Sequence, residues 1–413
     1  MSIYMNSDEA AMALGIRKAT LYAYVSRGLI ASIARKGRRE RQFRRADVAR
    51  LASHQAQARQ PKQVARATLD WGLPVLESSL TLIDDGLLYY RGKSFTEFLP
   101  GGKLEDVARL LWHDSSADFD IPPLSMSRHW QRQANALAGS SAMERTLPLF
   151  ALGAREIPSA FSRRPDDANA GVHLLRLLAA CVLGSAPGAL PLHEQCRRSW
   201  RLDARGAELV RVALVACADH ELNASSFTAR CIASTEADMS AAITGALAAL
   251  SGPLHGGFTE RIECLFDELQ RAPSLQRGIA EYLRHNKNLP GFGHPPYPRG
   301  DPRAVAIMGR VSASRTLTRI IELAQQLTGH QASLDFALVA ARRDLGLPRG
   351  SAFGLFAMGR TVGWIAHILE QRRQGGLIRP RAAYVGPGPS ANVPVVEGRV
   401  IRFNQRPADP DAQ

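Results

Sequence analysis

The first residues of the chain carry the pattern of a short helix. Ser7 is a favoured N-cap residue, and Asp8 and Glu9 would lie at the positive end of the helix dipole. The small and apolar residues at 10–14 continue the helix, and Gly15 stops it because glycine is favoured just beyond a helix C-terminus. The pattern therefore predicts a helix over residues 7–14.

A second helix is predicted directly after this stop. It begins at Arg17 or Lys18, continues through two tyrosines to Arg27, and ends at Gly28. A helix, a short glycine-containing turn and another helix together form the helix-turn-helix pattern. Contact with DNA is one interpretation of this segment, and a solvated basic arm or a module used for protein contacts is the other.

Residues 29–54 complete this first domain. The basic run 35–41 follows two isoleucines, and Gly37 within it could turn a β-hairpin. Asp47 is expected to cap a third short helix that runs through Leu51. Residues 1–54 are therefore predicted to form a small winged helix-turn-helix domain.

A linker over 55–71 and a larger helical region are expected next. Residues 55–63 are polar, contain Pro61 and lack bulky apolar side chains. At 76–92 a short alternating run is divided by a turn at 84–86, which predicts a small hairpin. Helical patterns interrupted by prolines occupy 115–200, and they strengthen from about Ala207 onward.

Composition fits a mainly helical protein with two or three folding units. The chain has 413 residues, of which 45% are apolar and 22% charged. No run of about 18 uncharged apolar residues and no secretory signal pattern is present, so we expect a cytoplasmic protein without a membrane partner. The five cysteines form no C-x-x-C pair, which predicts free thiols and neither a disulfide framework nor a zinc site.

The positive charge is concentrated at the N-terminus. The formal net charge is +14, and residues 1–60 hold 12 Lys and Arg against four Asp and Glu. More than half of the excess therefore lies in about a seventh of the chain, which indicates a polyanionic partner. The residues expected to contact double-stranded DNA are Arg17, Lys18, Thr20, Tyr22, Arg38 and Arg39.

Three histidines lie in segments that suggest chemistry in the larger region. His220, in Asp-His-Glu-Leu-Asn, could be a capping or core residue or a ligand-binding one, and the second histidine of a zinc motif is missing. His255 lies between glycines that allow close approach of a ligand, although a turn that starts a helix is the alternative. His294 lies on a Gly/Pro-rich loop nine residues before Arg303, so a proton donor and an anion-binding fork share one loop.

An acid and two further arginines complete the candidates. Asp335 lies between apolar residues, either as a helix N-cap or as a partly desolvated carboxylate with a raised pKa suited to a general base. Arg360 and Arg379 would ordinarily be surface residues. Taken singly, none of these segments identifies a function.

Taken together, the segments resemble the citrate synthase family over roughly residues 72–387. In chain order they are His-Glu-Leu-Asn (220–223), Gly-Pro-Leu-His-Gly-Gly (252–257), Gly-Phe-Gly-His (291–294), Asp-Pro-Arg-Ala (301–304), Asp-Phe (335–336), Gly-Arg-Thr-Val-Gly-Trp-Ile-Ala-His (359–367) and Ile-Arg-Pro-Arg (378–381). The first 50 residues resemble the MerR-type winged helix-turn-helix. The resemblance implies a mainly α fold, with a large domain of about 72–254 and 349–413 and a small domain of about 255–348.

The resemblance also implies roles. Asp335 would remove a proton from the acetyl group of acetyl-CoA, His255 would hydrogen-bond the thioester oxygen, and His294 would polarise the ketone of oxaloacetate. The groups that would hold oxaloacetate are His220, Arg303, Arg360 and, from the partner subunit of a homodimer, the residue matching Arg379. The implied reaction forms citrate and CoA with acetyl-CoA as co-substrate and needs no metal or cofactor.

Two departures from the family pattern bear on acyl-CoA binding. The loop after His294 reads Pro-Pro-Tyr-Pro, so only Arg299 supplies charge before Asp301. Phe258 stands where the family has a smaller alanine. The alternatives are a 2-methylcitrate synthase that uses propionyl-CoA and a transcriptional regulator whose synthase-like body senses oxaloacetate or acyl-CoA.

Overall fold

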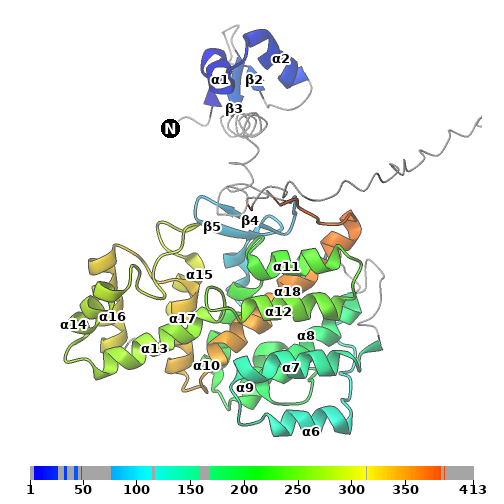
Figure 1. The fold of residues 1–413 in the computed structure, drawn as a ribbon, viewed down its shortest axis with the longest axis vertical. Helices are drawn as coiled ribbons and strands as arrows, with labels where there is room; N and C mark the ends of the chain where they lie inside the picture. The colour runs from blue at the N-terminus through cyan, green and yellow to red at the C-terminus, as the bar shows by residue number, and fades with distance from the viewer. Residues whose placement is uncertain are drawn as a thin grey trace, which may run out of the picture. The chain divides into compact units, whose positions relative to one another are not determined.

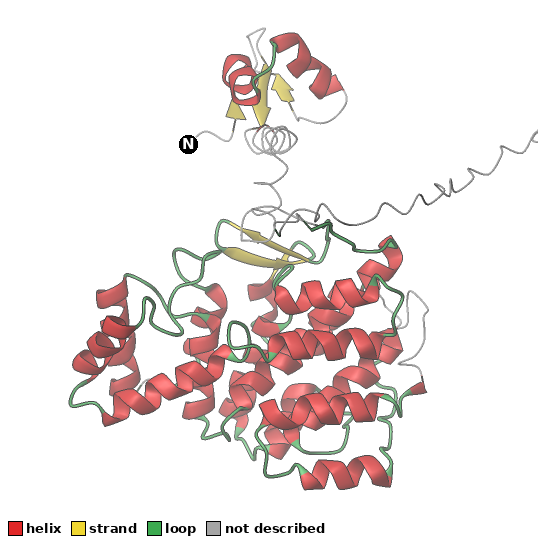
Figure 2. Cartoon of the chain, viewed as in Figure 1, coloured by secondary structure: helices red, strands yellow, loops and turns green. Residues whose placement is uncertain are grey.

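A computed structural model describes residues 4–26, 32–34, 41–44, 48, 76–113, 117–158, 168–312, 314–382 and 386. The chain divides into two compact units, one of Met1–Arg66 with Arg379–Gln413 and one of Ala67–Ile378 (Figure 1). The described residues are mostly helical, and their strands form two small sheets (Figure 2). The predicted mainly α architecture is therefore confirmed.

The first unit contains the predicted helix pair. Helix α1 spans Ser7–Leu14 and ends at Gly15, which has the left-handed φ of 60° expected of a C-cap. Its N-cap is Asn6, whose side chain accepts a hydrogen bond from the Glu9 backbone while Glu9 reaches back to the Asn6 backbone. The prediction of Ser7 as N-cap was wrong by one residue because this reciprocal capping box needs its acid three residues after the cap.

A three-stranded antiparallel sheet supports these helices. Its order is β1-β3-β2, and its strands are β1 (Tyr4–Met5), β2 (Ser32–Ala34) and β3 (Arg41–Arg44). Phe43 of β3 is fully buried against Met5, Leu14 and Leu21, the last from α2 (Lys18–Ser26). Strand β2 pairs with β3, as the predicted hairpin requires. The hairpin tip with Arg38 and Arg39, most of the third helix and the linker lie outside the described residues.

The second unit begins with the other predicted hairpin. Strands β4 (Thr81–Asp84) and β5 (Leu87–Tyr90) pair antiparallel, and β6 (Lys93–Ser94) adds a third strand. The turn residues Asp85 and Gly86 both have positive φ, 47° and 76°, which suits the tight turn of a two-residue hairpin. The hairpin predicted from the turn at 84–86 is therefore confirmed.

Helices build the rest of this unit. In chain order they are η1 (Phe95–Phe98), α5 (Leu104–Trp112), α6 (Arg128–Ala136), α7 (Ala142–Ala154), α8 (Ala168–Leu183), α9 (Leu192–Ser199), α10 (Ala204–Cys217), α11 (Ala224–Ala233), α12 (Met239–Leu250), α13 (Phe258–Arg271), α14 (Leu275–His285), α15 (Pro302–Met308), α16 (Arg315–Thr328), α17 (Leu334–Asp344) and α18 (Ser351–Gln374).

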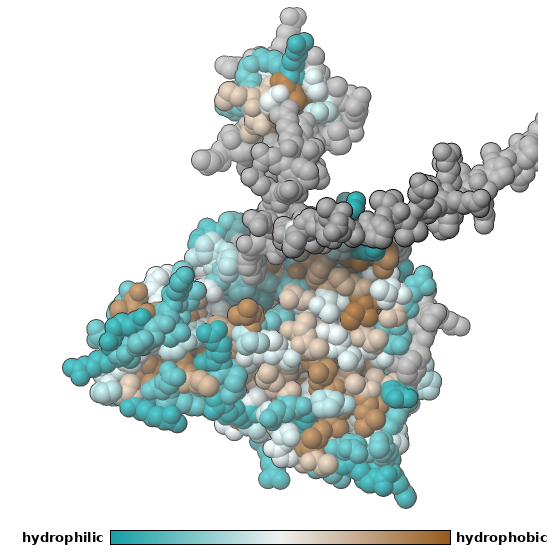
Figure 3. Space-filling model, viewed as in Figure 1, coloured by the Kyte–Doolittle hydropathy of each residue, from teal (hydrophilic) through white to brown (hydrophobic). Residues whose placement is uncertain are grey.

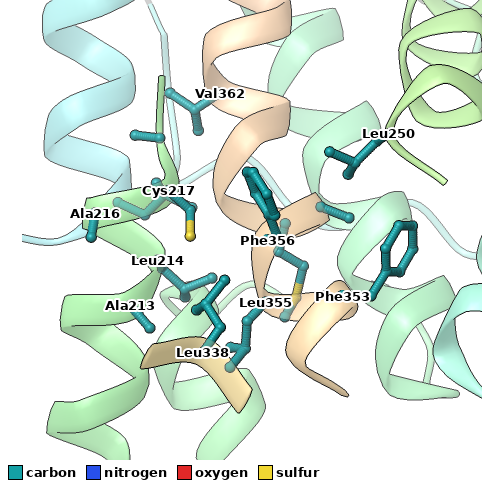
Figure 4. Packing of buried hydrophobic residues seen from close by; sticks show 14 of the residues in the cluster. Ala213, Leu214, Ala216, Cys217, Leu250, Leu338, Phe353, Leu355, Phe356 and Val362 are labelled. Atoms are coloured by element: carbon teal, nitrogen blue, oxygen red, sulfur yellow. The ribbon is translucent and has the colours of Figure 1, made fainter. Parts of the chain in front are cut away.

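Helix α18 forms the centre of this unit. It contacts α5, α8, α10, α11, α12 and α17, and all its residues from Ser351 to Gln371 are buried. It is long and apolar enough to cross a membrane, yet its apolar window is wholly buried by protein, as in the core helix of a globular fold. Figure 4 shows the packing, in which Phe356 and Val362 of α18 lie near Leu214 and Cys217 of α10.

Two glycines allow α18 to approach α10 closely. A Cβ at Gly359 would lie 2.6 Å from the Cys217 Cβ, and one at Gly363 would lie 2.3 Å from an Asp219 carboxylate oxygen. The Gly363 N–H instead donates to the Ala218 carbonyl at 2.9 Å. The close contact places Arg360, between these glycines, against the end of α10.

Candidate active site

The first site segment follows α10 directly. Asp219 is fully buried, accepts a hydrogen bond of 2.5 Å from the Thr81 hydroxyl of β4, and lies 3.3 Å from the His367 ring of α18. His220 comes next and is 6% exposed. The cap of α11 is Asn223, whose side chain accepts from the Ser225 and Ser226 backbones, so the interpretation of His220 as a capping residue was wrong.

His255 lies in the turn between α12 and α13. Its Nε2 lies 2.8 Å from the Ser225 hydroxyl, and Trp364 Nε1 donates to that same hydroxyl at 3.0 Å. The Phe356 ring meets the imidazole edge-on, with 5.7 Å between the ring centres. Two segments distant in sequence therefore fix the ring of a histidine whose own turn is glycine-rich.

His294 is fixed to the segment that carries Asp335. Gly293 donates its N–H to the Gln331 carbonyl, and Ser333 donates to the Gly291 carbonyl, each at 2.8 Å. Gly291 has φ of 85°, and a Cβ there would lie 2.9 Å from Phe336, so this close approach requires glycine. The two backbone hydrogen bonds bring the 291–294 loop to the start of α17.

Arg303 is held by a partner that the sequence analysis missed. Asp301 is the N-cap of α15, and its carboxylate accepts from Arg303 Nε at 2.9 Å and from Nη2 at 2.8 Å. It also accepts from the Leu334 backbone at 3.1 Å. Asp followed by Pro at the first helical position is a helix-start signal that could have identified this cap. These two hydrogen bonds occupy the Nε–Nη2 edge of the guanidinium, and Nη1 lies outside the pair with Asp301.

Arg360 is a buried cation with an unused donor. It is 1% exposed, its Nε donates to the Cys217 carbonyl at 2.9 Å, and its guanidinium lies 4.8 Å from the Phe356 ring centre. Among the described residues, Nη2 has no hydrogen-bond partner although it is buried. A buried charged donor without a partner is costly unless an anion binds there. The expectation of an ordinary surface arginine was therefore wrong.

Asp335 lies in the first turn of α17, after the N-cap Ser333, so its interpretation as an N-cap was wrong. The side chain is half-buried, and within the described part of the chain its buried Oδ1 has no hydrogen-bond partner. Desolvation raises the pKa of this carboxyl from 3.8 to about 6, and the charge of Arg303 opposes the rise. Such a carboxylate is more basic than an ordinary aspartate and remains ionised at pH 7.

The three histidines are neutral at physiological pH. Burial, aided by the Arg360 charge, lowers the pKa of His255 to about 3. Burial and Arg303 lower the pKa of His294 to about 4, and burial holds the pKa of His220 well below its ordinary value. A neutral imidazole can donate a hydrogen bond to an oxygen without first losing or gaining a proton.

Tyr297, which the sequence analysis did not select, joins these groups. Its hydroxyl lies 3.0 Å from His220 Nε2, and its ring centre lies 5.3 Å from that of His294. The His220 and His294 rings meet edge-to-face at 5.2 Å. The structure thus brings together the predicted residues His220, His294 and Arg303 around Tyr297. Besides burial, the charges of Arg303 and Arg360 lower the pKa of His220, and they oppose the raised pKa of Asp335.

Some predicted residues lie elsewhere or are already engaged. Arg379 is exposed and belongs to the first unit. Arg299 donates to the Asp85 carbonyl at 2.9 Å and to its carboxylate at 2.5 Å, so the one cation of the 295–300 loop is paired with the β4–β5 turn. Phe258 is the first residue of α13, and the Arg261 guanidinium lies 5.3 Å from its ring centre. A separate cavity of about 130 Å³ lies near the N-termini of α5 and α9 and includes none of the predicted site residues.

The predicted DNA-contacting residues that are described lie in or next to α2. Arg17, Lys18 and Tyr22 are exposed, whereas Thr20 is half-buried. Lys18 forms an ion pair of 2.7 Å with Asp8 of α1. The edge of the Tyr22 ring meets Phe43, with 6.0 Å between ring centres. The basic start of this helix therefore faces solvent.

Comparison with known proteins agrees with this geometry. Residues 68–381 match the family model of the citrate synthase C-terminal domain, and residues 4–56 match that of a helix-turn-helix domain. The chain is 39% identical over 249 residues to putative citrate synthase 2 of Mycobacterium tuberculosis, covering 55% of this chain and 67% of the relative. It is 33% identical over 240 residues to 2-methylcitrate synthase of Shewanella oneidensis, covering 56% of this chain and 59% of that protein.

A solved structure extends the match. The citrate synthase of Thermoplasma acidophilum, in a ternary complex with carboxymethyl coenzyme A and oxaloacetate, aligns with a TM-score of 0.67 and 25% identity. The alignment covers 79% of this chain and 97% of the archaeal chain. This chain belongs to the citrate synthase family and carries a helix-turn-helix domain at its N-terminus.

Proposed function

We propose that the protein condenses acetyl-CoA with oxaloacetate to form citrate and CoA. The observation that carries the proposal is Asp335, a carboxylate of raised pKa with an unpaired buried oxygen on which the charges of the buried Arg303 and Arg360 act. A thioester α-proton is weakly acidic, so a carboxylate removes it effectively only when a donor stabilises the developing enol oxygen. His255, neutral and held by Ser225, suits that donor role.

The steps follow from these assignments. Asp335 takes a proton from the acetyl methyl group while His255 donates a hydrogen bond to the thioester oxygen. The enol carbon then forms a bond to the keto carbon of oxaloacetate, and the keto oxygen, polarised by His294, takes up a proton. Water cleaves the resulting citryl thioester to citrate and free CoA.

Oxaloacetate is a dianion, and the buried arginines suit it. Among the described residues, the buried Nη2 of Arg360 has no hydrogen-bond partner. Arg303 pairs with Asp301 through Nε and Nη2, so its Nη1 lies outside that pair. Bidentate guanidinium–carboxylate pairs fix the orientation of a ligand as well as its charge. Arg379 would complete the site from the partner subunit of a homodimer.

The surface over α11 and α12 supports the homodimer. These neighbouring helices present mostly pale and apolar residues in Figure 3, whereas the area over α13 and α14 is mainly hydrophilic. The exposed and half-buried positions of α12 include Ala241, Thr244, Ala248 and Ala249, all small and uncharged. Small residues let helices of two subunits pack closely, as the proposed interface requires.

The test is free-thiol release from acetyl-CoA and propionyl-CoA, each with and without oxaloacetate. Oxaloacetate-dependent release is expected, and the ratio of the two rates distinguishes citrate from 2-methylcitrate synthesis. One methylene in a pocket changes selectivity by only about 1–3 kcal/mol, so propionyl-CoA is a close second substrate. No release with either thioester from a folded protein would favour a ligand-sensing regulator.

DNA binding is a second proposed function, supported by the helix-turn-helix match and by the exposed Arg17 and Lys18 at the start of α2. Fluorescence anisotropy of the full chain with duplexes selected from a random pool tests it. Affinity is expected to fall steeply with salt because phosphate contacts release counterions. Salt-insensitive or absent binding would reject it and leave a module for protein contacts.

A further inference from the structure

Tyr297 is buried without being part of the hydrophobic core. It is 2% exposed, yet the large hydrophobic cluster of the described residues does not include it. Burying a phenol in this way is favourable only when its hydroxyl has a partner and its ring has neighbours. In this structure both are groups assigned to substrate binding.

The Tyr297 side chain contacts three of the assigned residues. The hydroxyl is hydrogen-bonded to His220 Nε2 at 3.0 Å, and the ring packs beside His294. The Arg303 guanidinium carbon lies 5.2 Å from the ring centre, within the range of a cation–π interaction. His220 follows α10, His294 lies on the loop that begins at Gly291, and Arg303 lies in the first turn of α15. Tyr297 therefore connects this loop to the end of α10 and to the start of α15.

The backbone fixes the starting point of this side chain. The Tyr297 N–H donates to the His294 carbonyl at 2.8 Å, and the Gly300 N–H donates to the Tyr297 carbonyl at 3.0 Å. Two successive turns therefore hold Tyr297 in a set position relative to His294. The ring direction follows from the loop, and the hydroxyl reaches out of the loop to His220.

The hydrogen bond also selects a tautomer of His220. A neutral imidazole has one N–H donor and one acceptor nitrogen, and a phenol can donate or accept. The phenol O–H is the stronger acid and the unprotonated imidazole nitrogen the stronger base, so O–H···Nε2 is the favoured arrangement. The proton of His220 then lies on Nδ1, which becomes the donor for an anionic ligand.

We propose that Tyr297 is a positioning residue for the keto-diacid substrate, holding His220 in one orientation and tautomer and packing its ring against the Arg303 guanidinium. The proposal rests on the proposed function, because oxaloacetate is the ligand that His220 and Arg303 would bind. It assigns no role in proton removal from the acyl-CoA, which is left to Asp335.

The test compares Tyr297→Phe with the wild type by calorimetric titration of oxaloacetate. The phenylalanine keeps the ring near Arg303 and removes only the hydroxyl. The dissociation constant is expected to rise roughly three- to tenfold, as for loss of one hydrogen bond between neutral groups. The KM for acyl-CoA is expected to stay unchanged, a split that a general loss of packing would not produce.

Tyr90→Phe is the matched control. Tyr90 is also buried, and its hydroxyl donates to the Val215 carbonyl at 2.9 Å, so the variant loses a comparable bond to the backbone. An equal weakening of oxaloacetate binding in both variants would overturn the proposal. The proposal would also be overturned if the wild type bound oxaloacetate and Tyr297→Phe bound it with the same affinity.

A double-mutant cycle tests whether Tyr297 acts through His220. In a His220→Ala background, the Tyr297→Phe change is expected to lose most of its effect on oxaloacetate affinity. Additive effects would contradict this. Nitrogen NMR of labelled histidines tests the tautomer without substrate, with Nδ1–H expected in the wild type and a mixture in Tyr297→Phe. A wild type that did not bind oxaloacetate would reject the proposed function, while the NMR result would still decide the pairing.

Discussion

Replacing Asp335 with asparagine is expected to stabilise the fold while it abolishes turnover. The carboxylate is half-buried, its Oδ1 is unpaired among the described residues, and desolvation raises its pKa from 3.8 to about 6. The folded protein therefore binds this proton more tightly than the unfolded chain does. Ionising Asp335 in the folded state costs free energy that a neutral residue of the same size would not cost.

The magnitude follows from the difference in pKa. The pKa of Asp335 is about 2 higher in the folded protein than in the unfolded chain. This difference lowers the free energy of unfolding by up to about 3 kcal/mol above pH 7. The cost decreases as pH falls below 6, because the folded carboxyl becomes protonated, and vanishes below 3.8, where the unfolded carboxyl is protonated too. Asp335→Asn should thus raise the melting temperature at pH 8 by roughly 5 °C, and clearly less at pH 4.5.

Asp344→Asn, at the other end of α17, is the control. Burial by itself would raise the pKa of Asp344, but hydrogen bonds from Arg205 and Ser312 outweigh it and lower the pKa. Its contribution is stabilising at neutral pH and is lost as pH falls, so this variant should melt lower at pH 8. Thermal unfolding followed by circular dichroism measures both variants. The reasoning would be refuted if Asp335→Asn did not raise the melting temperature at pH 8, or raised it equally at pH 8 and pH 4.5.

Three further predictions follow from the site and the surface. Acyl-CoA turnover (kcat/KM) should rise through a pH of about 6 and then level off, because Asp335 must be ionised to act as base; a profile flat from pH 5 to 8 would exclude it as that base. Arg360→Lys should raise the oxaloacetate KM about 10- to 100-fold, since lysine keeps the charge but loses the fork, and an unchanged KM would show that the unpaired Nη2 binds no substrate. Ala248→Glu places a charge on the proposed interface at α12, so light scattering should show a shift from dimer toward monomer. Gln325→Glu, on the exposed side of α16, is the control and should leave the dimer unchanged. If both variants remained dimers, the interface would lie elsewhere.

Local features of the site were predictable because neighbouring residues determine them. The glycines around His294 and the turn at Asp85-Gly86 require backbone conformations that few other residues adopt, so their positions could be found in the sequence alone. The order and kind of the segments from 220 to 381 indicated the family. Even here the cap of α1 was misplaced by one residue, since Ser7 and Asn6 are both favoured cap residues and only the reciprocal bond to Glu9 decides between them.

Tertiary structure alone decided what each group can do. The sequence left Asp335 equally suited to a cap or a base, and the fold excluded the cap because Ser333 holds that position. Arg360 looked like a surface residue until the glycines of α18 brought it against α10. Nothing in the sequence distinguished Tyr297, and the Asp-Pro signal at 301–302 could have identified a helix cap but not the pairing of Asp301 with Arg303. The pKa of a carboxyl or imidazole depends on which segments remove its water, and those segments lie far away along the chain, so burial and pairing could be read only from the folded protein.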